Sequence, residues 1–499
     1  MKVDYEKFPD IPQGCQLNEN KKTGLFQVFR EHRVKDKETG RTRVVRETIG
    51  SIRDGVYRPG ENYLLRQRIA ELEKICAGKA SGQPSGRTEA ASETGRQAVE
   101  VQSCVATAVE KTGIDSRRKS RIQVSMPFIA LAGLMCALGG ESDAVRISDW
   151  IRTYRDFLER NLPEGMVEAV SHDTVRRCLM LVDTKKFEEF YEEMVYRLVR
   201  HTQNRVIAAD GQAIRATGLR RRDDGMQHGA RMVMSIYDTN SRVCLAYRLI
   251  DKKTNEITVG PQMIKRLSLS LAGSVVTADA LSCQVNFVNA VLDADADYLI
   301  SLKGNQELSW NEVRARFALT DESNMLRHST DFELAHGRIE KRTVDILPGK
   351  NLSRPLITKW RGLAGGSIVR VRRDAVYKST GQETRQDRFY VTSIPPYEEN
   401  AERIYEAIRA HWGIENNLHY MLDVSWNQDA VFAKNPCYIT NRSALNRMAL
   451  AFLENYSFWL WDTERSEGKE PLSISAVQAR CRKPEVAIEC LAVGLGYVR

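Results

Sequence analysis

Two short apolar runs, each closed by an aspartate, constrain the fold of this chain more than any other feature of its sequence. The first is Val206–Ala209, followed by Asp210, and the second is Ser274–Ala278, followed by Asp279. Short apolar runs bounded by polar residues are typical of buried strands. We therefore predict two strands of one sheet that bring both aspartates to the same edge of that sheet.

A third carboxylate, Glu415, lies in the segment His411–His419, which we predict to be helical. Hard divalent cations prefer oxygen ligands, and two such ions about 4 Å apart can hold the attacking and the leaving oxygen of a phosphodiester. Asp210, Asp279 and Glu415 are therefore candidate catalytic residues and candidate ligands of Mg²⁺, for which Mn²⁺ would substitute. Taken singly, each aspartate has a plainer interpretation as a turn former, and the glutamate as a surface charge.

Other ligand sets stay open around Glu415. Asp423 and Asp429 lie in the same block of sequence and are rival third ligands. His411, Glu415 and His419 follow one another at steps of four, which on an α-helix would place two imidazoles and a carboxylate on one face, as a zinc site requires. That zinc alternative lacks the H-E-x-x-H spacing and leaves the two aspartates unexplained.

The order of the predicted elements narrows the fold class to α/β. Between residues 205 and 332 we predict strands at 206–209, 232–237, 243–250, 274–278 and 298–302, with helices at 261–272, 284–293 and 307–318. Three strands, a helix, a strand, a helix and a strand is the order of an RNase H-like mixed sheet. Further strands at 338–347, 366–371 and 388–393 predict a β-rich insertion at 333–396. The core then resumes at 397–465 as helix, and a helical tail follows at 466–499.

Three segments precede this core. Residues 1–76 predict a small β-β-α module, with strands at 25–34 and 42–49 and a helix at 61–76. Residues 77–104 are rich in Ala, Gly, Ser, Thr and Glu, which predicts a flexible linker. Residues 105–204 predict a helical domain, in which Ser171 caps a helix. Each of the two folded segments is either a DNA-binding domain or, as the plainer alternative, an accessory or packing domain.

The charge of the chain suits a polyanionic partner. Lysine and arginine number 74 against 65 aspartates and glutamates, a net charge of +9, and the excess gathers in clusters. The alternative for any one cluster is solvated surface. Trp412 is either a core residue or a platform for a splayed base, and His411 and His419 either pack or contact phosphates. The candidate DNA contacts are Arg215, Arg220, Arg221, Arg222, Lys303, His411, Trp412 and His419.

The compartment is predicted from what the sequence lacks. None of the ten cysteines forms a C-x-x-C pair, which favours free thiols in a reducing cytoplasm. The first residues contain no apolar segment of the kind that a signal peptide carries. The longest apolar stretch, 126–138, is too short to cross a bilayer and predicts a buried helix. We therefore expect a cytoplasmic protein without a membrane partner.

Six motifs follow one another at suitable separations: Ala209–Gln212, Thr277–Gln284, Leu302–Gln306, His336–Glu340, Ile408–His419 with its continuation through Leu422–Trp426 and Gln428–Ala430, and Asn441–Leu450. Together they resemble the H-repeat-associated insertion-sequence transposases, a DDE-type family with an RNase H-like catalytic core. The resemblance covers roughly residues 110–460, so the module at the front is an addition. Related transposases also carry Tyr, Arg and Lys at fixed steps around the glutamate, a pattern that Tyr405, Arg409 and Leu422 do not reproduce.

The resemblance implies a DNA transposase that cuts the terminal inverted repeats of its insertion sequence and joins them to target DNA. It implies Asp210, Asp279 and Glu415 as the catalytic, metal-binding residues. Because two ends are cut together, it also implies a homo-oligomer assembled on DNA, in the bacterial cytoplasm and associated with the nucleoid. Two other functions stay open: a DNA-binding protein that descends from a transposase and has lost catalysis, and a metal-dependent DNA nuclease without a joining step.

Overall fold

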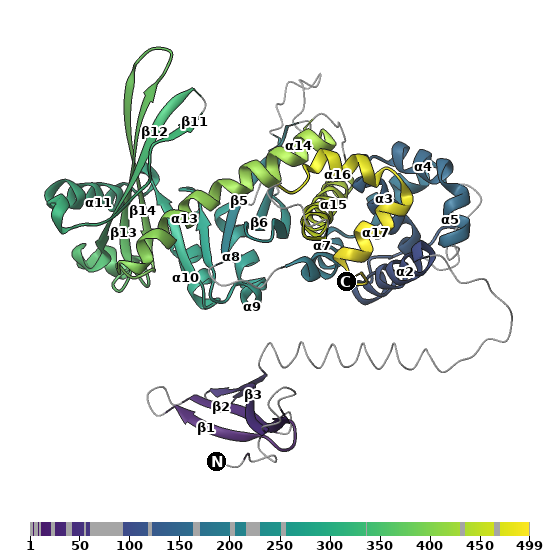
Figure 1. The fold of residues 1–499 in the computed structure, drawn as a ribbon, viewed down its shortest axis with the longest axis horizontal. Coiled ribbons are helices and arrows are strands. Elements are labelled where there is room, and N and C mark those ends of the chain that lie inside the picture. Colours follow the sequence, from purple (N-terminus) through teal and green to yellow (C-terminus); the bar gives the residue numbers. More distant parts are fainter. Residues whose placement is uncertain are drawn as a thin grey trace. The chain divides into compact units, whose positions relative to one another are not determined.

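A computed structural model gives the fold of the chain (Figure 1). It describes residues 3, 8, 11–20, 25–35, 42–53, 56–59 and 93–498, the last range without 118–121, 163–169, 200–204, 216–229, 251–255, 336, 430–434 and 464–469. The chain divides into two compact units, Met1–Ala90 and Ala91–Arg499.

The first unit contains a four-stranded antiparallel sheet in the order β1-β2-β3-β4. Its strands are β1 (Gln16–Asn20), β2 (Leu25–Lys35), β3 (Thr42–Arg53) and β4 (Val56–Pro59). Apolar side chains from several segments, including Ile11, Val28 and Ile52, form its core. The two predicted strands are confirmed as β2 and β3, whereas β1 and β4 were not predicted. The predicted helix at 61–76 lies outside the described residues.

A long helix begins within the stretch that the sequence predicts to be a linker. Helix α2 (Glu93–Thr112) starts the second unit, so for residues 93–104 the linker prediction is wrong. Ala98, Val101 and Val105 recur at helical spacing and are fully buried. Small apolar residues at this spacing let α2 pack against α17 (Pro484–Gly494), even though the overall composition of the stretch is polar. Residues 77–92 lie outside the described part.

The segment 105–204 is helical, as predicted, in the part that the structure describes. It contains α3 (Met126–Leu138), α4 (Ala144–Thr153), α5 (Arg155–Asn161), α6 (His172–Leu181), α7 (Thr184–Val195) and the 3₁₀ turn Tyr196–Leu198. Ser171 caps α6, as predicted, by accepting a hydrogen bond from the backbone N–H of Thr174. Nearly every residue of α3 is buried. Among the described residues, no helix is both long enough and apolar enough to cross a membrane.

One mixed sheet organises the rest of the second unit. Its order is β10-β12-β13-β14-β9-β8-β5-β6-β7, and β11 pairs beside β12. The predicted strands from 206 to 302 are confirmed as β5 (Val206–Ile214), β6 (Arg231–Asp238), β7 (Val243–Ile250), β8 (Val275–Ala278) and β9 (Asp297–Leu302). Strands β5, β8 and β9 run parallel, and β6 and β7 extend the sheet as an antiparallel pair. The connecting helices are α8 (Glu256–Arg266), α9 (Ser268–Leu271) and α10 (Val285–Asp293).

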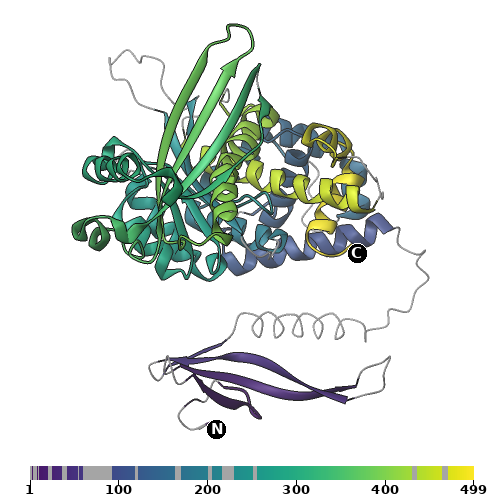
Figure 2. The ribbon, with the colours of Figure 1, turned by 60° about the vertical axis from the view of Figure 1, so that its left-hand side comes forward.

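The predicted β-rich segment continues this sheet. It contains β11 (Glu333–Ala335), β12 (Arg338–Pro348), β13 (Ser367–Tyr377) and β14 (Glu383–Thr392), preceded by β10 (Leu326–Ser329). Because β14 pairs directly with β9, the segment extends the edge of the central sheet. Helix α11 (Glu307–Leu319) and the short helix α12 (Arg354–Lys359) flank it. The long β12–β13 pair projects away from the rest of the second unit (Figure 2).

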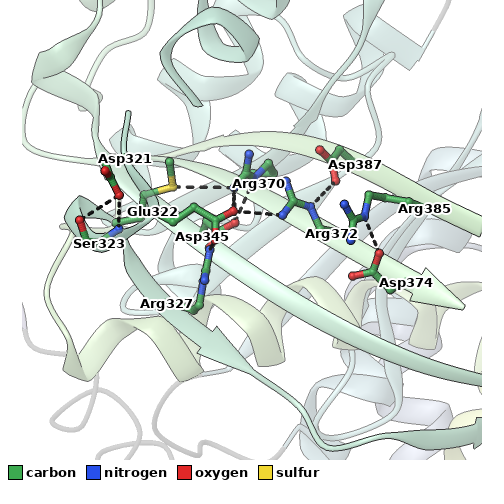
Figure 3. A network of polar contacts seen from close by, with 11 residues as sticks. Asp321, Glu322, Ser323, Arg327, Asp345, Arg370, Arg372, Asp374, Arg385 and Asp387 are labelled. Atoms are coloured by element: carbon green, nitrogen blue, oxygen red, sulfur yellow. Dashed lines mark hydrogen bonds and ion pairs between the residues drawn. The ribbon is translucent and has the colours of Figure 1, made fainter. Parts of the chain in front are cut away.

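Cross-strand charge pairs hold this extension together (Figure 3). The buried carboxylate of Asp345 accepts hydrogen bonds from Arg327 at 2.7 Å and from Arg370 at 2.6 Å. Arg372 bonds both Asp387 on β14 and Glu322 ahead of β10, each at 3.3 Å. The hydrogen bond to Asp345 raises the pKa of Arg327. On this face of the extension, therefore, a carboxylate neutralises each of these three arginines.

A run of consecutive helices crosses the sheet on the face opposite the charge pairs of Arg370 and Arg372. It consists of α13 (Glu399–Gly413), a π-helix (Ile414–His419) and α14 (Tyr420–Trp426), as Figure 1 shows. Ile404, Ala407 and Ile408 of α13 pack on apolar residues of β5, β8, β12 and β13 in a separate hydrophobic core. Helix α15 (Pro436–Thr463) follows and packs against α3 and α7. The predicted helical tail is confirmed as α16 (Ile474–Cys481) and α17.

Candidate functional site

The parallel pairing of β5 and β8 places the two aspartates at adjacent positions. Ala209 of β5 pairs with Ala278 of β8. The next residue in the chain is Asp210 after the first and Asp279 after the second. The expectation that Asp210 ends its strand is wrong, because β5 continues to Ile214 as the partner of β6. Strand β8 does end there. The two side chains therefore leave neighbouring strands at one level of the sheet. The backbones of neighbouring strands are about 4.8 Å apart.

Each aspartate already has contacts within the chain. Oδ1 of Asp279 accepts hydrogen bonds from the backbone N–H groups of Leu281 at 3.0 Å and Ser282 at 3.2 Å, the turn-forming role that the plainer interpretation assigned to it. Oδ2 of Asp210 lies 3.7 Å from Nδ1 of His419, and the Asp210 side chain is 21% exposed. The second oxygen of Asp279, Oδ2, takes no part in these hydrogen bonds of the turn.

Glu415 lies on the π-helix that follows α13. π-Helical turns are rare and often occur at functional sites. His411 and His419 are partly buried, whereas Glu415 is exposed. The three residues at steps of four therefore differ in exposure, and Glu415 is the one open to solvent.

The two histidines are neutral near pH 7. Burial lowers the pKa of His411 to about 4, against a smaller opposing effect of Asp279. Burial, with smaller contributions from the charges of Arg447 and His411, lowers the pKa of His419 to about 3. The contact of His419 with Asp210 is therefore not an ion pair, and 3.7 Å is too long for a hydrogen bond. Nδ1 of His411 instead shares a 3.0 Å hydrogen bond with Thr277 of β8.

The described residues include no group of three or more His, Cys, Asp or Glu side chains arranged to hold a metal ion. This finding counts against the zinc alternative of His411, Glu415 and His419. Two adjacent carboxylates, Asp210 and Asp279, have the donor chemistry that a hard cation prefers. A third ligand does not complete the set in this arrangement, so the three-carboxylate metal site stays a prediction.

The rival ligands Asp423 and Asp429 have partners of their own. Asp429 accepts a hydrogen bond from the backbone N–H of Arg215 at 2.9 Å, and it also pairs with the guanidinium of Arg215 at 3.4 Å. The carboxylate of Asp423 accepts hydrogen bonds from the side-chain NH₂ group of Gln212. Burial, followed by the charge of Asp429, raises the pKa of Asp423. Both carboxylates contact the part of the chain that follows Asp210 on β5: Asp423 bonds Gln212, and Asp429 bonds Arg215.

The other predicted DNA contacts fall in several places. Arg220, Arg221 and Arg222 lie outside the described residues. Arg215 is exposed at the end of β5. Lys303 is exposed after β9, and two residues later the side chain of Asn305 donates a 2.6 Å hydrogen bond to Ala280 O. The loop after β9 is thus fixed to the loop that follows Asp279.

An arginine-rich aromatic pocket lies beside this site, where α13 crosses β12, β13 and β14. Trp412 is 37% exposed, so its interpretation as a core residue is wrong. The guanidinium carbons of Arg388 and Arg409 each lie 5.6 Å from the centre of the Trp412 ring. The cationic and aromatic lining consists of Arg342, Arg373, Arg388, Arg409, Tyr390, Tyr405 and Trp412.

The positive charge of this pocket is only partly neutralised. Among the described residues, Arg342 pairs with Glu340 and Glu333, but no ion pair involves Arg373, Arg388 or Arg409. Sequence reasoning did not select Arg373 or Arg388. The alternation of side chains along β13 could have indicated Arg373, because Arg370 and Arg372 point to the charge-paired face and Arg373 points to the opposite one.

Comparison with known proteins identifies the family. Residues 201–451 match the transposase DDE domain family. The chain belongs to this family. It is 27% identical over 389 residues to the putative transposase YncI of Escherichia coli O157:H7, which covers 76% of this chain and 93% of YncI. It is 26% identical over 318 residues to the H repeat-associated putative transposase YhhI of Escherichia coli K12, which covers 63% of this chain and 81% of YhhI. The resemblance drawn from the six motifs is thus confirmed.

Proposed function

We propose that this member of the transposase DDE domain family is an active DNA transposase, which cuts the ends of an insertion sequence and joins them to target DNA. The observation that carries the proposal is the register of β5 and β8, which sets Asp210 and Asp279 at adjacent positions. The strand order β7-β6-β5-β8-β9 agrees with an RNase H-like core. Glu415 supplies the third carboxylate from the helix that crosses these strands.

Asp210, Asp279 and Glu415 would hold Mg²⁺, or Mn²⁺ in its place, and the bound cations would activate the nucleophile and stabilise the leaving oxygen. The neutral imidazoles of His411 and His419 have a different role. They border the aspartates without adding positive charge, so they exclude water and leave the carboxylates free to act as ligands. Glu415 is exposed, and the proposal requires that it come to the aspartates when DNA binds.

The DNA lies, in this proposal, across the arginine-rich pocket, past Arg215 at the end of β5 and along the loop after β9. Arg373, Arg388 and Arg409 provide positive charge that no described carboxylate neutralises, and Trp412 offers an exposed ring for stacking. Lys303 and Arg215 extend this surface on the carboxylate side. Terminal inverted repeats and target DNA are the proposed partners, and two copies of the chain would assemble on a pair of ends.

The proposal is tested with DNA that carries the terminal repeats flanking the gene. The purified protein is incubated with this DNA and Mg²⁺, and nicked and joined products are separated on a denaturing gel. Asp210→Asn should remove both products while leaving DNA binding intact, because the change removes a charge at the site and no arginine.

The outcomes separate the proposed function from its alternatives. If the wild-type protein binds the ends but cuts nothing under Mg²⁺ or Mn²⁺, it is a DNA-binding derivative of a transposase. If it cuts, but a pre-cut end with a free 3′-hydroxyl yields no joined product, it is a nuclease. Cleavage that Asp210→Asn and Asp279→Asn leave unchanged would contradict the proposed site itself.

A further inference from the structure

A buried glutamine connects the strand of Asp210 to the helical segment that carries Glu415. Gln212 follows Asp210 by two residues on β5, so both side chains leave the same face of the strand, and Gln212 is 7% exposed. Its amide nitrogen donates to the backbone oxygen of His419 at 3.3 Å and to the carboxylate of Asp423 at 3.3 Å. One side chain therefore holds β5 against both the π-helix and α14.

The amide oxygen of Gln212 extends the connection to a third helix. It accepts hydrogen bonds from Gln428 and from Arg447 of α15, each at 3.4 Å. Arg447 is 1% exposed and also bonds Ser443, whose hydroxyl donates to Gln428 at 3.0 Å. An arginine can only donate and an ionised carboxylate can only accept, so the orientation of the Gln212 amide is determined by its partners.

Every hydrogen-bonding site of this amide is in use: the NH₂ group donates twice and the oxygen accepts twice. A glutamine that only filled space would not need four partners from separate segments. Resting on the proposed function, we propose that Gln212 is a positioning residue, which sets the distance between Asp210 on β5 and Glu415 on the π-helix. It contacts no substrate and acts through the segment that it holds.

The test exchanges the two ends of the amide–carboxylate pair. Gln212→Glu sets a second carboxylate against Asp423, and the double variant Gln212→Glu, Asp423→Asn restores one amide and one carboxylate with their places exchanged. The carboxylate introduced at position 212 can still accept from Arg447. A matched control is Gln478→Glu, because Gln478 is also a buried glutamine, at 8% exposure, but lies on α16.

Two readouts are compared among these variants: amide hydrogen exchange over residues 414–426, and the cleavage rate at saturating DNA. Gln212→Glu should speed exchange over 414–426 by about tenfold or more, leave exchange in α17 unchanged, and slow cleavage by about tenfold or more at an unchanged Kd for DNA. The double variant should recover the part of both losses that comes from the contact with position 423, whereas the hydrogen bond to His419 O stays lost because a carboxylate has no proton to donate. Gln478→Glu should exchange over 414–426 like the wild type.

The inference is overturned if Gln212→Glu leaves exchange over 414–426 unchanged, if α17 loses protection to the same degree, or if the double variant recovers nothing. Its failure is distinguishable from failure of the proposed function. If Asp210→Asn cuts DNA as the wild type does, or the wild type is inert, the proposed function fails, while hydrogen exchange still decides whether Gln212 holds the segment. If Asp210→Asn is inert and Gln212→Glu cuts normally, only the positioning role fails.

Discussion

Acid should weaken this fold through the buried imidazole of His419. Burial and the nearby charges of Arg447 and His411 lower its pKa from 6.5 to about 3. In the unfolded chain this imidazole binds a proton below about pH 6.5, whereas in the folded protein it stays neutral until about pH 3. The stabilisation is therefore fully present above pH 6.5 and is lost as the pH falls through that window.

The magnitude follows from the slope of about 1.4 kcal/mol per pH unit within the window. Between pH 7.5 and pH 5.0, His419 should lower the free energy of unfolding by about 2 kcal/mol. His411, whose pKa is lowered to about 4, should add a similar loss over the same interval. Carboxylates with raised pKa values, such as Glu192 at about 7, act in the opposite direction, so the wild-type curve alone does not isolate the effect.

The assay therefore compares variants of the metal-free protein. All seven tryptophans lie between residues 150 and 461, so their fluorescence during urea unfolding reports on the second unit. His419→Gln should lose about 2 kcal/mol less than the wild type between pH 7.5 and pH 5.0. His172→Gln is the control, because that imidazole is 55% exposed on α6. Equal losses in His419→Gln and the wild type would refute the reasoning that burial keeps this imidazole neutral.

Three further predictions concern packing, a buried ion pair and the DNA surface. Gly366→Ala should destabilise the second unit by about 1–3 kcal/mol in urea unfolding, because its Cβ would meet a backbone oxygen of β14 at 2.2 Å, whereas Gly365→Ala has open space and should change little. Asp238→Ala should cost about 3–5 kcal/mol in the same assay, because it leaves the guanidinium of Arg205, now 2.9 Å away, buried without its carboxylate; a loss below about 1 kcal/mol would contradict this. Trp412→Ala should weaken binding to DNA ends by about 1–3 kcal/mol in fluorescence anisotropy, and an unchanged Kd would exclude stacking on this ring.

The sequence was sufficient to predict the strands that are buried on both faces. The runs that became β5, β8 and β9 are apolar because parallel strands are covered on both faces, and this made them recognisable. Helix α2 was missed because its buried positions are filled by alanine and valine within a polar composition, and only the spacing of those residues distinguishes it from a linker. Strand β4 is only four residues long, and the Asp54-Gly55 turn signal that precedes it was not used.

The candidate site was predictable in its strands and less so in its helix. The register of Asp210 and Asp279 follows from the parallel pairing of two similar runs. The π-helix could not be read from periodicity, because it changes the number of residues per turn over only six residues. The contacts of Gln212 depend on segments more than 200 residues away, which local pattern does not encode.

Mn²⁺ binding tests most directly whether the three carboxylates act as one site. Isothermal titration of Mn²⁺ into the protein bound to DNA ends should give a strong signal for the wild type. Asp210→Asn, Asp279→Asn and Glu415→Gln should each weaken that binding, whereas Asp429→Asn should not. Binding that survives Glu415→Gln but is lost in Asp423→Asn or Asp429→Asn would contradict the account, because the third ligand would then lie elsewhere in the chain.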